Sequence, residues 1–160
     1  MATRLLKQVA LRLEEEVDGL SLEDGALKAI LGVRFSEVMV VIDHDEEVGS
    51  IRVSVAVPPP AGAGRSFLVF CLSLNTLYWD VKLGLDEDGA LVVHSDFDAP
   101  CEANLDILSA TVLDRIESIL DVLNDDVVGW LLEHNLGTPR QRSRWESFLR
   151  DDDDEDSLTL

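Results

Sequence analysis

Five consecutive residues, Asp43-His44-Asp45-Glu46-Glu47, carry the densest set of chemically active side chains in the sequence. Carboxylate oxygens and imidazole nitrogens are metal ligands, and together with His94 this stretch could form a metal-binding or small enzymatic site. Adjacent loop residues rarely converge on one ion, and no His-x-x-x-His motif or cysteine pair accompanies them. The sequence therefore favours a solvated turn here, with a metal site as the alternative.

Three further motifs that could carry chemistry have simpler interpretations. Gly62-Ala63-Gly64-Arg65 lacks the Lys-Ser/Thr of a phosphate-binding loop, and we interpret it as a linker. Asp86-Glu87-Asp88-Gly89 is too short for a calcium loop and is typical of a hairpin turn. Cys71 and Cys101 match neither a zinc motif nor a disulfide framework, which indicates free thiols. We expect neither a cofactor nor an enzymatic activity.

Composition and charge limit the classes of partner. The chain has 160 residues, of which 46% are hydrophobic, and this suits one domain with a buried core. The chain has 13 basic and 32 acidic residues, and the net charge of −19 disfavours direct binding to nucleic acid or to an anionic membrane.

The longest apolar stretch, Phe67 to Leu74, is far shorter than the ~20 residues of a membrane span. The polar residues of the N-terminus argue against a signal peptide, so we expect a cytoplasmic protein.

Hydrophobic periodicity predicts a mixture of helices and antiparallel strands. Apolar residues at three- and four-residue steps predict amphipathic helices over 3–17 and 102–133. A continuous apolar run predicts a buried helix over 65–76. Alternating and β-branched residues predict strands over 37–43, 51–57, 78–85 and 90–97.

The segment 21–31 is ambiguous in the sequence. Ser21 and Asp24 resemble the capping box that begins a helix, whereas Leu20, Leu22 and Ala26 also fit an edge strand. We favour a short helix for this segment.

Three features follow one another between residues 3 and 134. They are a strand pair from Val38 to Val57, an apolar helix that ends in Leu74-Asn75-Thr76-Leu77 and is followed by a strand and the turn from Leu85 to Leu91, and an acid-rich amphipathic helix from Asn104 to His134. This order resembles the type III secretion chaperones and the related YbjN-like bacterial family. The resemblance implies an α+β fold, in which an antiparallel sheet is flanked by an N-terminal helix, a central helix and a long C-terminal amphipathic helix.

The same resemblance implies a small, acidic, homodimeric protein without catalysis. Secretion chaperones hold partner segments against exposed apolar strips and sheet edges, whereas YbjN-like proteins are described as regulators. The segment from Pro139 to Leu160 departs from the pattern of both groups, so the resemblance implies nothing about its role.

The long helix over 102–133 carries two surfaces that could bind a partner. Its apolar arc of about 140° is wider than contact with one sheet face requires, so its border would be exposed in a monomer. We expect this border to form a dimer or partner surface, made of Leu113, Leu120, Leu131 and Trp130. The alternative is that the N-terminal helix or the segment 21–31 covers it. The opposite side forms an acidic face, made of Asp114, Glu117, Asp121 and Asp125.

The charge pattern divides the chain into three predicted parts. Residues 1–135 form a single chaperone-like domain, residues 136–150 a basic, helical appendage, and residues 151–160 an acidic disordered tail. The appendage either folds back on the acidic helix face of its own or a paired subunit, or forms a free arm that captures a partner. Its basic and apolar side chains are Arg140, Arg142, Arg144, Trp145 and Phe148.

These observations favour a non-catalytic, acidic protein-binding module that acts as a chaperone or regulatory cofactor. A net charge of −19 favours a partner with a basic surface, such as a protein that handles nucleic acid. A DNA mimic that competes for a basic groove is the first alternative, and a small metal-binding or enzymatic domain is the second.

Overall fold

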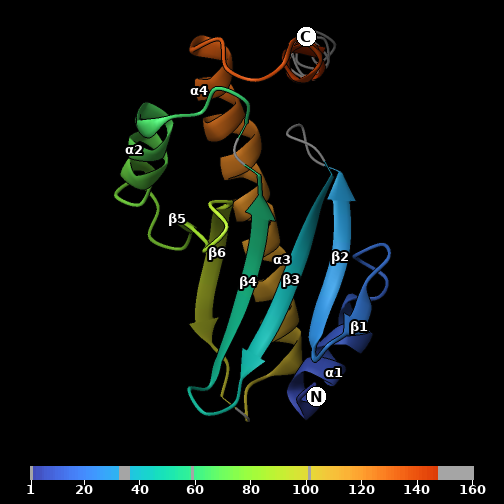
Figure 1. The fold of residues 1–160 in the computed structure, drawn as a ribbon. Helices are drawn as coiled ribbons and strands as arrows, with labels where there is room; N and C mark the ends of the chain where they lie inside the picture. Colours follow the sequence, from blue (N-terminus) through green and yellow to red (C-terminus); the bar gives the residue numbers. More distant parts are fainter. Residues whose placement is uncertain (1, 33–36, 59, 101, 148–160) are drawn as a thin grey trace, which may run out of the picture.

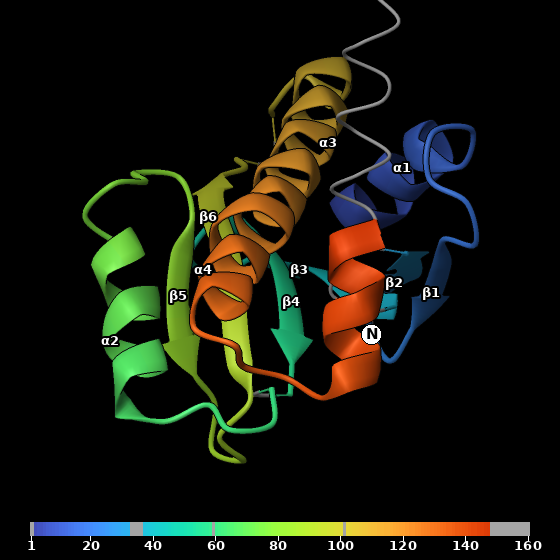
Figure 2. The same ribbon diagram turned by 90° about the horizontal axis from the view of Figure 1, so that it is seen from above.

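A six-stranded antiparallel sheet forms the centre of the molecule, and helices cover one of its two faces (Figures 1 and 2). The structure is a computed structural model that describes residues 2–32, 37–58, 60–100 and 102–147. The strand order is β1-β2-β3-β4-β6-β5, because the chain leaves the sheet after β4 and returns through the β5–β6 hairpin. The strands are β1 (Ser21–Glu23), β2 (Ala26–Gly32), β3 (Glu37–Asp45), β4 (Ser50–Val57), β5 (Lys82–Leu85) and β6 (Leu91–Asp98). The α+β class predicted from the sequence is confirmed.

Helices α1 (Arg4–Leu13) and α3 (Leu105–Asp121) pack on the covered face, and α2 (Arg65–Leu74) lies beside β5 (Figure 2). The alternation of β4 explains how the core forms. Ile51, Val53 and Val55 are almost fully buried beneath the helices, whereas Arg52 faces the open side of the sheet. The predicted β3–β4 pair and the predicted β5–β6 hairpin are confirmed, although β5 begins only at Lys82.

The N-terminal helix begins where the sequence predicts and ends earlier. The Thr3 hydroxyl accepts a hydrogen bond from the Leu6 N–H at 3.2 Å and so caps α1, which ends at Leu13 rather than residue 17. The helix expected over 21–31 is wrong, because this segment forms the β1–β2 hairpin. Asp24 and Gly25 make the turn with φ of +52° and +85°, a conformation that a two-residue Asp-Gly connection favours.

The long helix contains a π-helical segment that changes its register. α3 continues through Val122–Val127, which is π-helical, into α4 (Val128–Glu133). A π-helical turn inserts one extra residue, so Leu131 takes the inward position that a regular helix would give to Trp130. Leu131 is fully buried, and its predicted place on an exposed border is therefore wrong. Within the described residues, no helix combines the length and apolar character needed to cross a membrane.

The basic appendage packs through an aromatic side chain. Residues 139–147 are helical, and Trp145 is fully buried in the same core cluster as the sheet and helices. A Cβ atom on Gly137 would lie 2.7 Å from the Trp145 ring, so this glycine allows the close approach. Arg142 donates a hydrogen bond to the Asn135 carbonyl at 2.9 Å. Phe148 and the acidic tail over 151–160 lie outside the described residues.

The described part of this segment packs on the rest of the chain through Trp145, and pairing of its arginines with the acidic helix face stays a prediction. Trp145 is fully buried in the core cluster, so apolar packing contributes to this docking. Burying an aromatic side chain contributes more free energy than an exposed ion pair.

Candidate functional site

The histidine and acids of the stretch 43–47 point to opposite sides of the sheet. Strand β3 continues to Asp45, so Asp43 and Asp45 lie on the open face and His44 lies on the covered face. There the His44 Nδ1 is 2.6 Å from the Thr3 hydroxyl oxygen. Among the described residues, no three His, Cys, Asp or Glu side chains converge as a metal site would require. The residues of the predicted metal alternative are therefore not brought together by β3.

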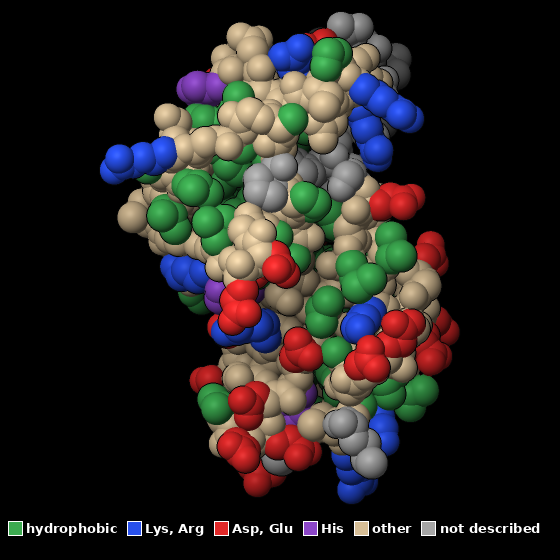
Figure 3. Space-filling view, viewed as in Figure 1, with side chains coloured by type: hydrophobic (Ala, Val, Ile, Leu, Met, Phe, Trp, Pro, Cys, Tyr) green, Lys and Arg blue, Asp and Glu red, His purple; other side chains and the backbone are tan. Residues whose placement is uncertain are grey.

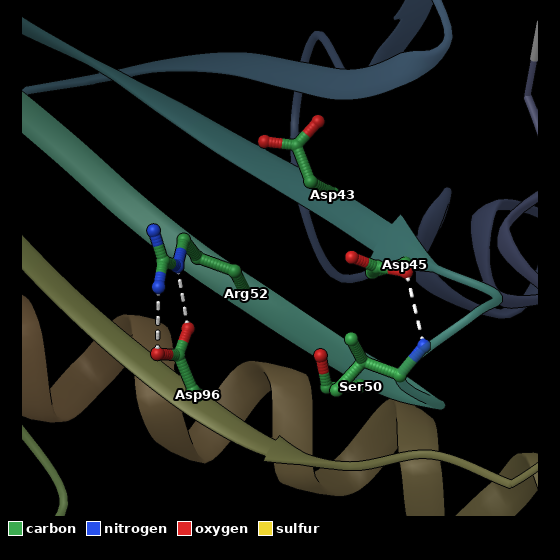
Figure 4. Close-up of a pocket in the computed structure, with 6 residues that line it drawn as sticks. Asp43, Asp45, Ser50, Arg52 and Asp96 are labelled. Atoms are coloured by element: carbon green, nitrogen blue, oxygen red, sulfur yellow. Dashed lines mark hydrogen bonds and ion pairs between the residues drawn. The ribbon is translucent and has the colours of Figure 1, made fainter.

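A polar hollow of about 540 Å³ lies on the open face, between β3, β4 and β6 (Figure 4). Arg52 donates two hydrogen bonds to Asp96, at 2.6 and 2.9 Å, and this lowers the pKa of the Asp96 carboxyl. Asp45 accepts the backbone N–H groups of Glu47 and Val48. Arg52 is thus already paired with Asp96, and Asp45 binds backbone N–H groups of the turn between β3 and β4.

His94 lies next to this ion pair on β6. Its Nδ1 is 3.6 Å from the Asp96 carboxylate, and burial lowers the pKa of its imidazole. Ser54 lies opposite His94 on β4, and among the described residues no hydrogen bond joins its hydroxyl to the imidazole as a base–nucleophile pair would require. This part of the open face is therefore polar, and its ion pair joins β4 to β6.

Helix α2 is exposed along one apolar side, so the buried helix expected from its sequence is only partly correct. Phe67, Cys71 and Leu74 pack into the core, and burial raises the pKa of the Cys71 thiol to about 12. Val69 and Leu72 are 58% and 55% exposed. The sequence signal for this surface is the excess of apolar residues, seven of ten in α2, because such a helix leaves some of them uncovered when it packs on one side only.

Strand β5 extends the apolar side of α2. Leu85 is 50% exposed, and it lines a small hollow of about 70 Å³ between helix and strand. Every residue of this hollow is apolar or glycine: Leu68, Cys71, Leu72, Gly84, Leu85 and Leu91. We refer to Leu68, Val69, Leu72, Gly84 and Leu85 together as the α2–β5 surface.

Asn75 holds β5 beside the end of α2. Its side-chain Nδ2 donates to the Leu83 carbonyl at 2.9 Å, and its Oδ1 accepts the Leu83 N–H at 2.7 Å. Lys82 donates to the Asn75 and Tyr78 carbonyls, which terminate the helical segment. Asn75 thereby occupies the outer edge of β5 at Leu83. A partner on this surface would contact side chains rather than add a strand at that position.

The α2–β5 surface lies in the part of the sequence that has no acid. No aspartate or glutamate occurs from Val48 to Trp79, although the chain holds 32 of them. Figure 3 shows hydrophobic side chains gathered over α2 and β5 at the upper left, whereas red acidic side chains crowd the lower half. The five residues of the α2–β5 surface are therefore apolar and carry no charge themselves, although Arg65 begins α2 and Asp86 follows Leu85.

The predicted border of the long helix divides among three places. Leu113 and Leu120 are half-buried and line a groove of about 440 Å³ beside β2. Trp130 stacks on Phe70 of α2, with ring centroids 5.1 Å apart. Leu131 is buried in the core. These four residues therefore do not form one continuous surface, and only the first two line the groove.

The acidic face of the long helix has the exposure that its periodicity indicates. Asp114, Glu117, Asp121 and Asp125 are all exposed. Glu117 and Asp121 stand at the rim of the groove that Leu113 lines. The structure thus brings part of the predicted acidic face next to part of the predicted apolar border.

Comparison with known proteins gives matches of structure only. No family model matches the chain, and no curated protein matches its sequence significantly. YbjN from E. coli, a proposed transcription regulator, is 19% identical with a TM-score of 0.59, over 87% of this chain and 98% of that one. The fold is that of the YbjN-like proteins and type III secretion chaperones. The resemblance inferred from the sequence is therefore confirmed at the level of fold.

Two solved complexes also contain this fold. The ExsC–ExsE complex matches with 16% identity and a TM-score of 0.56, over 76% of this chain and 94% of that one. The HopA1–SchA chaperone–effector complex matches with 17% identity and a TM-score of 0.50, over 72% of this chain and 87% of that one. At these identities the likeness establishes the architecture and leaves the function to be argued from the surfaces of this chain.

Proposed function

We propose that this chain is a non-catalytic protein-binding module of the cytoplasm, which forms a homodimer and acts as a chaperone or regulatory cofactor of another protein. The α2–β5 surface is the observation that carries the proposal. Val69, Leu72 and Leu85 are each at least half exposed, and soluble monomers rarely leave such apolar groups clustered. The chaperone–effector complexes of the same fold add support for a protein partner.

A second copy of the chain is the occupant that fits the α2–β5 surface best. Two copies that each carry a net charge of −19 repel one another, and the repulsion is smallest where no acid lies at the contact. The acid-free stretch from Val48 to Trp79 supplies α2, and β5 adds Leu85. Symmetric pairing of one apolar patch with itself is the commonest arrangement of homodimers.

The rest of the surface favours a basic partner, because electrostatic attraction speeds encounter with positively charged proteins. A protein that handles nucleic acid has this chemistry. The exposed row of Asp114, Glu117 and Asp121 also favours a second candidate, a DNA mimic. A mimic would be displaced from its partner by DNA, whereas a cofactor would bind the same partner alongside DNA, and a competition assay separates the two.

Sedimentation equilibrium of the purified chain tests the proposal. We expect a mass near 35 kDa at micromolar concentration, twice the 17.7 kDa of one chain. Leu72→Glu places a charge in the apolar contact and should give the mass of one chain. Ile107→Glu is the matched control, because Ile107 is 66% exposed on α3, away from α2. A wild-type mass near 18 kDa would contradict the homodimer.

A further inference from the structure

The groove between α3 and β2 has an apolar floor. Leu113, Ile116 and Leu120 of α3 face Leu31 of β2 and Val17 of the turn that follows α1. Ile116 and Val17 are almost fully buried, whereas the three leucines are partly exposed. A volume of about 440 Å³ lies within the range of pockets that bind ligands, and it can accept a few apolar side chains of a peptide.

Four acids surround this floor: Glu16 and Asp18 on the side of the first helix, and Glu117 and Asp121 on α3. All four are exposed, and none forms an ion pair or side-chain hydrogen bond with another described residue. Acids on both sides of an apolar floor repel one another across it, and a bound cation would remove this repulsion. We refer to these nine residues as the acidic groove.

The charges exclude several occupants. A second copy of this chain would bring its own acids against the rim, and nucleic acid or an anionic membrane would bring phosphates. The chain's own basic helix over 139–147 is already packed on the rest of the chain, because Trp145 is buried in the core and Arg142 binds the Asn135 carbonyl. The occupant that fits these charges is a segment of another protein with both apolar and basic side chains.

Helical structure suits that segment. The rim offers carboxylates on α3 and on the turn after α1, which the side chains of a ligand would contact. β1 pairs only with Ala26, Leu27 and Lys28, so the outer edge of β2 beyond Lys28 is not paired with β1. A helix satisfies its own backbone hydrogen bonds and needs only side-chain partners. We propose that the acidic groove binds a basic amphipathic helix of a partner protein, whose apolar side chains fill the floor and whose Lys or Arg side chains pair with the rim. This inference rests on the proposed protein-binding function.

A designed peptide tests the inference directly. The probe is a fluorescein-labelled 18-residue peptide of leucine and lysine, with leucine at helical i, i+3, i+4 and i+7 positions, and fluorescence anisotropy measures its Kd in 50 mM NaCl. The double variant Glu117→Gln/Asp121→Asn should weaken binding about tenfold, because two desolvated charge pairs are lost. The control Glu87→Gln/Asp88→Asn changes the net charge equally in the exposed hairpin turn, and it should change the Kd less than twofold.

Further variants test the apolar floor and the shape of the ligand. Leu120→Asn should also weaken binding about tenfold, and a scrambled peptide of the same composition should bind at least tenfold more weakly. Equal weakening by the hairpin control, equal affinity for the scrambled peptide, or no binding to the wild type would overturn the inference. Sedimentation of the groove variants separates this result from the proposed function, because they should remain dimers whatever the peptide does.

Discussion

The α2–β5 surface and the acidic groove are both partly apolar, but they differ in charge. Val69 and Leu72 lie on a helix whose sequence neighbourhood holds no acid, whereas Leu113 and Leu120 of the groove have Glu117 and Asp121 beside them. A net charge of −19 therefore does not describe every surface of the molecule. Uncharged apolar area permits association between like-charged copies, and apolar area rimmed by acids selects a basic partner.

The basic helix over 139–147 tests whether apolar packing or charge holds a segment on this acidic chain. We expect Trp145→Ala to lower the free energy of unfolding by about 3–5 kcal/mol, because a fully buried aromatic ring is lost from the core. Arg140→Gln should change it by less than about 0.5 kcal/mol, because Arg140 is exposed. Urea unfolding measures both values. A larger loss for Arg140→Gln would show that charge, rather than packing, holds the helix.

Asn75 tests how β5 is held in place at the α2–β5 surface. Asn75→Ala removes both partners of the Leu83 backbone groups, and we expect a loss of about 1–3 kcal/mol in urea unfolding. Thr76→Ala is the control, since Thr76 is exposed and its hydroxyl only donates to the Ser73 carbonyl. The freed edge should also make the variant more prone to aggregate. Equal stability of the two variants would show that the Asn75 bridge is not formed.

Salt should change the binding affinities of the two surfaces in opposite directions. Between 50 and 500 mM NaCl we expect the dimer to tighten, because screening reduces repulsion between two acidic chains. Over the same range the basic peptide should bind the acidic groove several-fold more weakly. Sedimentation and anisotropy measure the two constants. A parallel change in both would show that one surface serves both partners.

Tyr78 provides the smallest and most local test, because it joins the loop after α2 to the long helix. Its hydroxyl donates to the Asp126 carboxylate at 2.5 Å, and this bond raises the pKa of Tyr78 to about 12. Tyr78 is the single tyrosine, so absorbance at 295 nm reports it alone. The stabilisation is present below the unfolded pKa near 10 and is lost as the pH rises to about 12. Asp126→Asn should return the midpoint toward about 10, and a wild-type midpoint near 10 would contradict the bond.

Most of the fold is predictable from local pattern. The strict alternation of Ile51, Val53 and Val55 defines a half-buried strand, and the Thr3 cap marks the start of α1. The β1–β2 hairpin was missed because the Ser21 and Asp24 capping box was preferred over an edge strand, whereas Asp24-Gly25 in fact makes a hairpin turn. The inward position of Leu131 was not predictable, because helical periodicity in a sequence does not indicate a π-helical insertion.

The proposed binding surfaces were harder to predict from the sequence than the fold. Glu117 and Asp121 could be assigned to an exposed face from their spacing, but Glu16 and Asp18 reach the same groove only through tertiary packing. Hydrophobicity alone assigned Val69 and Leu72 to the core. Whether an apolar side of a helix is covered depends on what packs against it, and that information is long-range.

Sedimentation of the labelled peptide with wild type and with Leu72→Glu tests most directly whether the two surfaces are independent. The peptide should sediment with a protein of about 35 kDa in the wild type and with one of about 18 kDa in the variant, at the same affinity within about twofold. Loss of the peptide together with loss of the dimer would contradict the account, because it would mean that α2–β5 and the acidic groove act as one site.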